Sequence, residues 1–224
     1  MRFLILHFDA PMQSWGASLS TGVREAGQSP TLSGVVGLVA NALGRDRDED
    51  MSDLVRPMAV RTDRAGVIER DFQTIGVGTG IGKIGEDGEI PSKVKVDKDG
   101  KVSARYYQAD AAHVVALAEA PGALSLEVVA DALTTPKRAL YLGRRAFPIA
   151  EPIVREGIVE ADDIVSALAA VPAPERHDEH RTLTVETSIS DPNGRRAFDI
   201  PRSFGRYSAR YLTTIPAKES DPCI

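Results

Sequence analysis

The sequence has little cysteine and no long apolar run. Cys223 is the single cysteine in 224 residues, which excludes a disulfide framework and fits a reducing compartment. No stretch approaches the roughly 20 apolar residues of a membrane span. The short apolar run at the N-terminus is interrupted by His7 and Asp9, unlike a secretory signal peptide. We therefore expect a cytoplasmic protein that contacts no membrane.

An excess of positive charge is also missing. The chain has 27 Lys and Arg against 32 Asp and Glu, a formal net charge of −5 at pH 7. This balance argues against a protein that coats nucleic acid through its overall charge. It is compatible with a local basic site, because salt screens surface fields beyond about 10 Å.

The sequence shows no catalytic constellation. Its four histidines are His7, His113, His177 and His180. His177 and His180 lie in a proline-rich loop without a third ligand nearby, so a solvated loop is favoured over a zinc site. No Ser/His/Asp arrangement and no paired acids stand out. We predict no catalytic residues, no metal site and no cofactor.

The composition favours one α+β domain over residues 1–224. Apolar residues make up 42% of the chain, enough for a sizeable core, and we find no internal repeat or domain boundary. Residues 3–8 predict a buried strand that Pro11 ends, and a helix should end at Leu43 with Gly44 as its C-cap. Strands are also expected at 58–62 and 67–75, with a turn at 64–66.

The stretch from Pro11 to Gly44 organises the chain. It begins with a loop, PMQSWG, in which an exposed tryptophan would be unusual. The following helix should have Thr31 or Ser33 as its N-cap. Gly34 and Gly37 indicate close approach by another backbone or a ligand. The alternative is that Trp15 caps the core and that the glycines let the helix pack tightly on the sheet. A helix N-terminus with small and hydroxyl residues is suited to anions.

Residues 76–101 hold seven glycines. Gly80, Gly82 and Gly85 match the GxGxxG dinucleotide pattern, but no helix follows them, so we reject that interpretation. Alternation on both sides of the turn at 97–100 predicts a projecting β-hairpin instead. We expect residues 76–108 to form an inserted glycine-rich arm and hairpin.

Two later stretches combine bases with aromatics. Residues 137–145, KRALYLGRR, carry four bases and no acid around Tyr141 and Gly143. Residues 195–211 carry five arginines against one acid, Asp199, and include four aromatic residues. Bases interleaved with aromatics suit a surface that contacts phosphates and nucleobases.

Two motifs carry a resemblance to a known family. PMQSWG followed by PTLSGVVGLVANALG, and YLGRRAFP at residues 141–148, resemble the CRISPR-associated CasD family of the RAMP superfamily. The resemblance implies a ferredoxin-like, RNA-recognition-like fold with a β-hairpin thumb and a C-terminal β extension. It also implies a non-catalytic subunit of a type I-E Cascade complex that binds the 5′ handle of the guide crRNA.

The resemblance further implies protein partners. These are the Cascade backbone subunit and the large subunit that recognises the PAM, with target DNA reached only through the complex. In that family a separate subunit cuts the RNA. Two alternatives stay open: a metal-independent endoribonuclease that processes repeat RNA, and a purely protein-interaction subunit.

The residues expected to bind RNA come from both motifs and their surroundings. We expect the helix start and two arginines to receive phosphates, and Trp15, Tyr141 and Gln13 to contact splayed bases. The full set is Met12, Gln13, Ser14, Trp15, Arg24, Thr31, Ser33, Gly34, Tyr107, Tyr141, Gly143, Arg144, Arg145, Arg202 and Arg206.

Overall fold

A computed structural model describes residues 1–16, 23–24, 27–75, 101–203 and 206–217. It is a mixed α/β structure built on one mostly antiparallel sheet. The elements in chain order are β1 (Arg2–Gln13), β2 (Val23–Arg24), α1 (Leu32–Leu43), η1 (Ser52–Leu54), β3 (Met58–Arg64), β4 (Val67–Ile75), β5 (Lys101–Ala118), α2 (Leu126–Thr134), β6 (Ile158–Glu160), α3 (Ile164–Ala169), β7 (Thr182–Thr187), β8 (Arg195–Ser203) and β9 (Arg206–Pro216).

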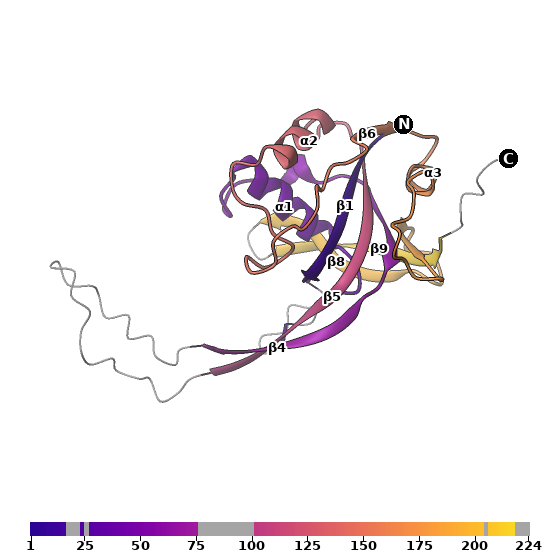
Figure 1. Ribbon diagram of the computed structural model, residues 1–224. Helices are drawn as coiled ribbons and strands as arrows, with labels where there is room; N and C mark the ends of the chain where they lie inside the picture. The colour runs from indigo at the N-terminus through magenta and orange to yellow at the C-terminus, as the bar shows by residue number, and fades with distance from the viewer. Residues whose placement is uncertain (17–22, 25–26, 76–100, 204–205, 218–224) are drawn as a thin grey trace, which may run out of the picture.

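The sheet has the strand order β6-β1-β5-β3-β7-β9-β8, and β2 and β4 pair with β5 outside this path. Its two faces bury separate cores because side chains alternate along each strand. Leu4, Leu6 and Phe8 of β1 pack in the core that α1 and α2 cover. Phe3 and Ile5 belong to the core on the other face, which Leu168 of α3 covers. Figure 1 shows α1 and α2 beside each other, with α3 on the opposite side of the strands.

The first strand is longer than predicted. Pro11 does not end it: β1 pairs with β5 both at Ala10↔Ala111 and at Met12↔Ala109. The other neighbour of β1, β6, pairs only with Arg2–Leu4. Pro11 therefore lies on a part of β1 that acts as a sheet edge, where a proline is tolerated.

The helix boundaries follow their caps, as predicted for α1. Thr31 has extended backbone, and its side chain accepts a hydrogen bond from the Gly34 N–H at 3.2 Å. Gly44 closes the helix in the left-handed conformation, with a φ of 78°. Ser125 and Asp163 cap α2 and α3 in the same way as Thr31 caps α1.

A two-stranded ribbon of β4 and β5 extends away from the body (Figure 1). The turn between β3 and β4 lies where the sequence placed it, and Gly66 has a φ of 66° there. β4 pairs with β5 from Val67↔Ala109 to Ile75↔Lys101. Residues 101–108, which we expected in an inserted hairpin, are the outer part of β5 and continue into the central sheet. The predicted hairpin turn at 97–100 lies outside the described residues.

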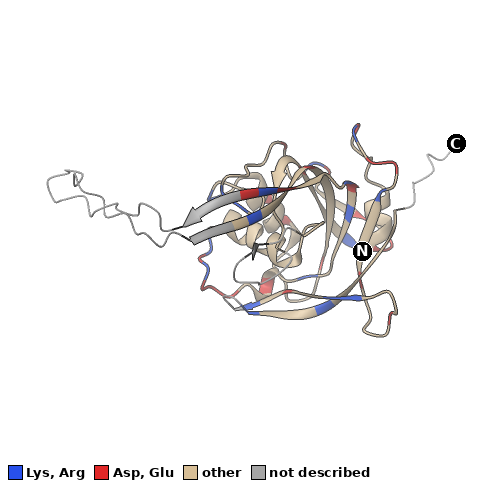
Figure 2. Cartoon of the chain, turned by 90° about the horizontal axis from the view of Figure 1, so that it is seen from below, with Lys and Arg blue, Asp and Glu red and all other residues tan. Residues whose placement is uncertain are grey.

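Charged residues of both signs are spread over the body. Figure 2 shows segments of both colours, blue for Lys and Arg and red for Asp and Glu, on many parts of the described chain. None of the helices in the described ranges is long and apolar enough to span a membrane.

Candidate nucleic-acid interface

The two sequence motifs meet in space. The Ser14 N–H donates a hydrogen bond to the Leu142 carbonyl at 3.0 Å. Gly143, next in the chain, has a φ of 86°, and a Cβ on it would lie 1.8 Å from the Ser14 carbonyl oxygen. Gly143 is therefore required for a close backbone approach, but the backbone that approaches it is that of Ser14.

The loop 141–148 is a compact turn closed by its own backbone. Tyr141 bridges Pro148, the Leu142 N–H donates to the Phe147 carbonyl at 2.8 Å, and the Phe147 N–H donates to the Arg144 carbonyl at 2.8 Å. Leu142 and Phe147 are buried and anchor the turn. Gly143 and Arg145 are exposed at its tip, and Tyr141 is half-buried. The turn thus presents one arginine to solvent from a fixed backbone.

Arg144, the neighbour of Arg145, is engaged within the chain. Its Nη2 donates to the Tyr106 carbonyl at 2.7 Å, and its Nη1 lies 3.5 Å from Asp71 Oδ2. The guanidinium lies over the Phe147 ring, 5.3 Å from the centroid. Arg144 thus ties the loop to the base of the β4–β5 ribbon, and its role as a phosphate ligand stays a prediction.

The two other bases of this stretch also have intramolecular contacts. Arg138 donates to the Arg45 carbonyl and to the Asp46 carboxylate, each at 2.7 Å. The Lys137 N–H donates to the Ala42 carbonyl, and its side chain passes close to Gly44. Lys137 and Arg138 are exposed beside the end of α1, whereas Arg145 is the base that the tip of the loop 141–148 exposes.

Trp15 and Gln13 are buried, which corrects their predicted contact with splayed bases. Trp15 is 1% exposed, and its ring packs against Phe8 with centroids 5.1 Å apart. Its Nε1 donates to Gln13 Oε1 at 2.9 Å, while Gln13 Nε2 donates to the carbonyls of Phe8 and Ala111. These two side chains pack beneath the loop, inside the core. Their chain neighbours Met12 and Ser14 are half-buried.

The start of α1 holds an anion, but one from this chain. The Leu32 N–H donates to Asp199 Oδ2 at 2.9 Å. Arg210 holds the same carboxylate in two hydrogen bonds of 2.7 and 2.8 Å. An acid of this chain thus accepts the Leu32 N–H within the anion site predicted at Thr31, Ser33 and Gly34, and phosphate binding by those three residues stays a prediction.

The close approach predicted at Gly34 has a different cause as well. A Cβ there would lie 2.9 Å from Cε3 of Trp15 and 3.0 Å from Thr31 Oγ1. Gly34 therefore admits the Trp15 ring. A Cβ on Gly37 would meet nothing within 4 Å, so no close approach explains that glycine.

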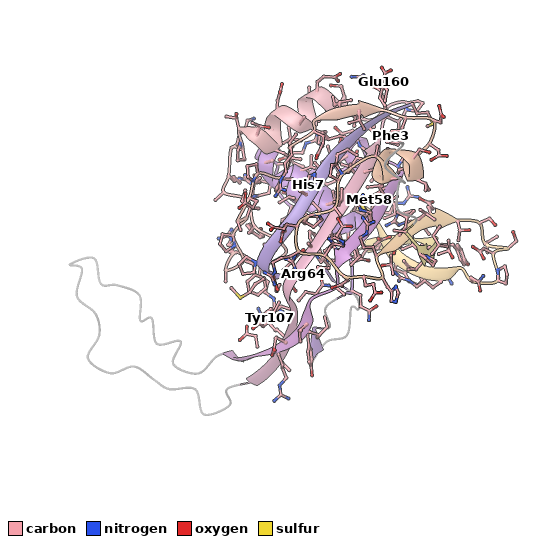
Figure 3. All side chains as sticks on the ribbon, turned by 45° about the vertical axis from the view of Figure 1, so that its right-hand side comes forward. Phe3, His7, Met58, Arg64, Tyr107 and Glu160 are labelled. Carbon is pink, nitrogen blue, oxygen red and sulfur yellow. The ribbon has the colours of Figure 1, made fainter. Side chains whose placement is uncertain are left out.

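Tyr107 lies at the base of the ribbon, where Figure 3 shows it below Arg64. Its ring lies 5.4 Å from that of Phe147, so it joins the loop 141–148 to β5. Arg24 is on β2, which pairs with β5 at Arg24↔Arg105, and the described part of the structure does not include its side chain. Arg202 and Arg206 are exposed on β8 and β9, and Arg202 Nε donates to Ser208 Oγ at 2.7 Å.

Three of the described histidines have different surroundings. His113 is fully buried, 3.0 Å from Thr62 Oγ1, and burial lowers its pKa from 6.5 to about 3. His7 pairs with Glu156 at 2.6 Å, and His177 is exposed. Within the residues that the structure describes, no group of three or more His, Cys, Asp or Glu side chains could hold a metal ion.

Sequence reasoning missed the partnership of Asp199 and Arg210. Both lie in the basic, aromatic stretch 195–211, and their spacing gave no sign that they pair across β8 and β9. A β-bulge between Phe198 and Ile200 inserts Asp199 as an extra residue in β8. A single acid among five arginines was the available signal.

Comparisons with known proteins agree over most of the chain. Residues 3–213 match the family described as CRISPR-associated protein (Cas_Cas5). The CRISPR system Cascade subunit CasD of Escherichia coli (strain K12) is 31% identical over 175 residues, 74% of this chain and 75% of that protein.

Two solved structures are similar to this one at the level of the whole chain. A chain of a CRISPR RNA-guided surveillance complex has a TM-score of 0.75 and 31% identity, covering 97% of this chain and 90% of that one. A second, described as a Cas protein, has a TM-score of 0.72 and 32% identity, with 97% and 95% covered. The chain therefore belongs to the CRISPR-associated Cas5 family, which includes the Cascade subunit CasD.

Proposed function

We propose that this chain is a non-catalytic scaffold subunit of a type I-E Cascade complex in the cytoplasm. In this role it binds and caps the 5′ handle of the guide crRNA and contacts the backbone subunit and the large subunit. The observation that carries the proposal is the junction of Ser14 with Leu142 and Gly143. The junction joins the two motifs that define the resemblance into one surface, and family membership gives that surface its context.

The handle site that we propose centres on fewer residues than the set predicted from the sequence. Its centre is the exposed loop tip of Gly143 and Arg145, with Tyr141 beside it. Single-stranded RNA is recognised by cations that meet phosphates and by aromatic rings that stack on bases. In this arrangement Arg145 meets a phosphate and Tyr141 a base, while Trp15, Gln13 and Arg144 hold the loops in place.

Further contacts of the handle come from nearby strands. We assign secondary phosphate contacts to Arg24, Arg202 and Arg206, of which the latter two are exposed. Met12, Ser14 and Ser33 are half-buried along the same motif and can offer polar or van der Waals contacts. Target DNA is reached only through the assembled complex.

The strand order supports a single ferredoxin-like domain. β6-β1-β5-β3 is antiparallel throughout, and α1 and α2 connect β1 to β3 and β5 to β6. This is the arrangement of two βαβ-type crossovers interleaved in one sheet. β7, β9 and β8 extend the sheet as the C-terminal β extension, and the β4–β5 ribbon forms the base of the thumb. We propose that this ribbon, with Tyr107 at its base, faces the backbone subunit.

A salt titration of a fluorescent handle RNA tests the site. If Arg145 contacts a phosphate, Arg145→Ala should weaken binding and shallow the log–log salt slope by about 0.7. Arg138→Ala is the matched control, because this exposed arginine already pairs with Asp46 and should leave the slope unchanged. A slope for Arg145→Ala equal to that of the control would reject the site.

Incubation with labelled repeat RNA separates the proposal from the nuclease alternative. We expect binding without cleavage, with or without divalent metal, because the histidines are buried, paired with an acid or isolated. Specific cleavage that His113→Ala abolishes, in a variant that still folds, would make the chain an endoribonuclease.

A further inference from the structure

An aromatic face lies at the end of the sheet formed by β7, β9 and β8. Residues directly opposite each other on paired strands share a face, and alternate residues along one strand share it too. Tyr211 is opposite both Thr187 and Arg196, and Phe198 is opposite Ala209. Tyr207, Ala209 and Tyr211 alternate along β9. The aromatic face therefore comprises Arg196, Phe198, Tyr207 and Tyr211.

This face is on the other side of the sheet from α1. Leu183 of β7 lies in the core beneath α3 and is opposite Ile215. Thr187, four residues later, is on the same face of β7 and is opposite Tyr211. α3 contacts β1, β3 and β5. Ile215 and Phe198 are 41% and 56% exposed. The face thus continues the second core outward from α3 to an exposed end.

The ring of Phe198 is exposed and is not covered by a neighbouring aromatic across the strands. Arg196 places its guanidinium carbon 4.6 Å from the centre of the Phe198 ring. The residue opposite Phe198 is Ala209, whose small side chain gives the ring no stacking partner across the strands. A large exposed aromatic held by an arginine, with further aromatics beside it, is the arrangement that stacks nucleobases.

The charge of the face also favours a polyanion. Arg196 is exposed on this face, and Asp199, the only acid in β8 and β9, is buried against Arg210. Glu186 of β7 alternates with Thr187 and so lies on the opposite face. No carboxylate of the described β7, β8 or β9 residues therefore shares the face with Arg196. Asp191, in the turn after β7, is the nearby acid, and it accepts a hydrogen bond from Thr187 Oγ1 at 2.7 Å.

Protection of the sheet edge does not account for Phe198. β8 is an edge strand, and its bulges, its arginines and Pro201 are devices that discourage pairing with other chains. An exposed phenylalanine works against that purpose, because it adds apolar surface to the edge. Its position requires another explanation.

We propose that the aromatic face binds single-stranded RNA, with a nucleobase stacked on Phe198 and a phosphate held by Arg196. The tyrosine hydroxyls suit RNA, since the 2′-hydroxyl both donates and accepts hydrogen bonds. This site goes beyond the proposed handle site. It lies on the other face of the sheet from α1, whose first turn packs against the loop of the first motif.

The test uses the full chain with its handle site saturated by unlabelled handle RNA. The probe is a fluorescent oligouridine of about ten nucleotides, within the span of one single-strand binding surface. Phe198→Ala should weaken its binding about 5- to 150-fold with an unchanged salt slope. Arg196→Ala should shallow the slope by about 0.7. Val128→Ala is the control, an exposed apolar residue on α2, and circular dichroism confirms that each variant folds.

Several outcomes would overturn the proposal. These are oligouridine that fails to bind once handle RNA is saturating, equal affinities of Phe198→Ala and Val128→Ala, or oligothymidine that binds as tightly as oligouridine. If Phe198→Ala instead impairs assembly with protein subunits and leaves oligouridine binding intact, the face binds protein. Handle binding by Arg145→Ala is measured separately, so failure of the handle site is distinguishable from failure of the aromatic face.

Discussion

The backbone N–H of Leu32 donates a hydrogen bond to Asp199 Oδ2 at 2.9 Å, across 167 residues of sequence. The first turn of α1 is thereby fixed to the C-terminal part of the sheet. The carboxylate is also the partner of Arg210, and both side chains are almost fully buried. One buried ion pair thus joins the start of α1 to the β8–β9 hairpin.

Removal of this carboxylate should be costly. Asp199→Ala leaves the buried Arg210 without its main partner, and we expect the free energy of unfolding to fall by about 3–5 kcal/mol. Urea denaturation followed by circular dichroism measures the change. Asp46→Ala breaks an exposed pair with Arg138 and should lower it by less than about 1 kcal/mol.

A double variant isolates the cause. If the cost comes from an unpaired buried cation, Arg210→Met should restore much of the stability of Asp199→Ala. A double variant as unstable as Asp199→Ala alone would instead assign the loss to the helix cap.

Two glycines of α1 should respond in opposite directions to the same substitution. Gly37→Ala should raise the free energy of unfolding by up to about 1 kcal/mol, because its Cβ would meet nothing within 4 Å. Gly34→Ala should lower it, because its Cβ would lie 2.9 Å from the Trp15 ring. Thermal unfolding of both variants decides the matter, and a gain in stability at Gly34 would contradict the packing described here.

Gly143 should be far less replaceable than another left-handed glycine. Gly122 has a φ of 77° and open space around it, so Gly122→Ala should cost about 1–2 kcal/mol from backbone strain alone. Gly143→Ala adds a clash with the Ser14 carbonyl, and we expect a total of about 2–5 kcal/mol. If denaturant unfolding gives the two variants equal losses of the free energy of unfolding, the clash with Ser14 is relieved at no cost.

Stability should fall in mild acid because of His113. Burial, and to a smaller extent the charge of Arg64, lower its pKa from 6.5 to about 3 in the folded protein. Between these values the unfolded chain takes up a proton that the folded chain excludes. The contribution of neutral His113 to the free energy of unfolding is therefore fully present above about pH 6.5 and is lost as the pH falls toward 3.

The variant His113→Asn replaces the imidazole near Thr62 with an amide, which is polar but does not titrate. Its free energy of unfolding should depend less steeply on pH between about 6.5 and 3 than that of the wild type. His177→Asn, at an exposed histidine, should retain the full slope. Parallel slopes for the wild type and His113→Asn would contradict the shift.

Local chemistry was predictable from the sequence, and partners across the sheet were not. The caps at Thr31 and Gly44 follow from residue type and neighbours, and the structure confirms both. Trp15 was placed on a loop after Pro11 and expected to contact splayed bases. Its burial depends on Gly34, Phe8 and Gln13, and no spacing between these residues indicates a contact.

The basic stretch 137–145 was misjudged for a related reason. A run of bases without acids indicates a charged surface only if the acids lie far away. Asp46 and Asp71 are distant in sequence, yet they approach Arg138 and Arg144 in the fold. The contact of Gly143 with Ser14 likewise joins residues that are distant in sequence.

The length of β5 has a mechanical consequence. Its 18 residues would span about 60 Å if fully extended, and Asp110, with a φ of 55°, interrupts the extended backbone near the middle. Its inner half is clamped between β1 and β3, and its outer half carries the ribbon with β4. Arg144 acts as a brace between the loop 141–148 and Tyr106, near the point where the ribbon leaves the body. A force on the ribbon would therefore act, through β5, on the central sheet and on the loop 141–148.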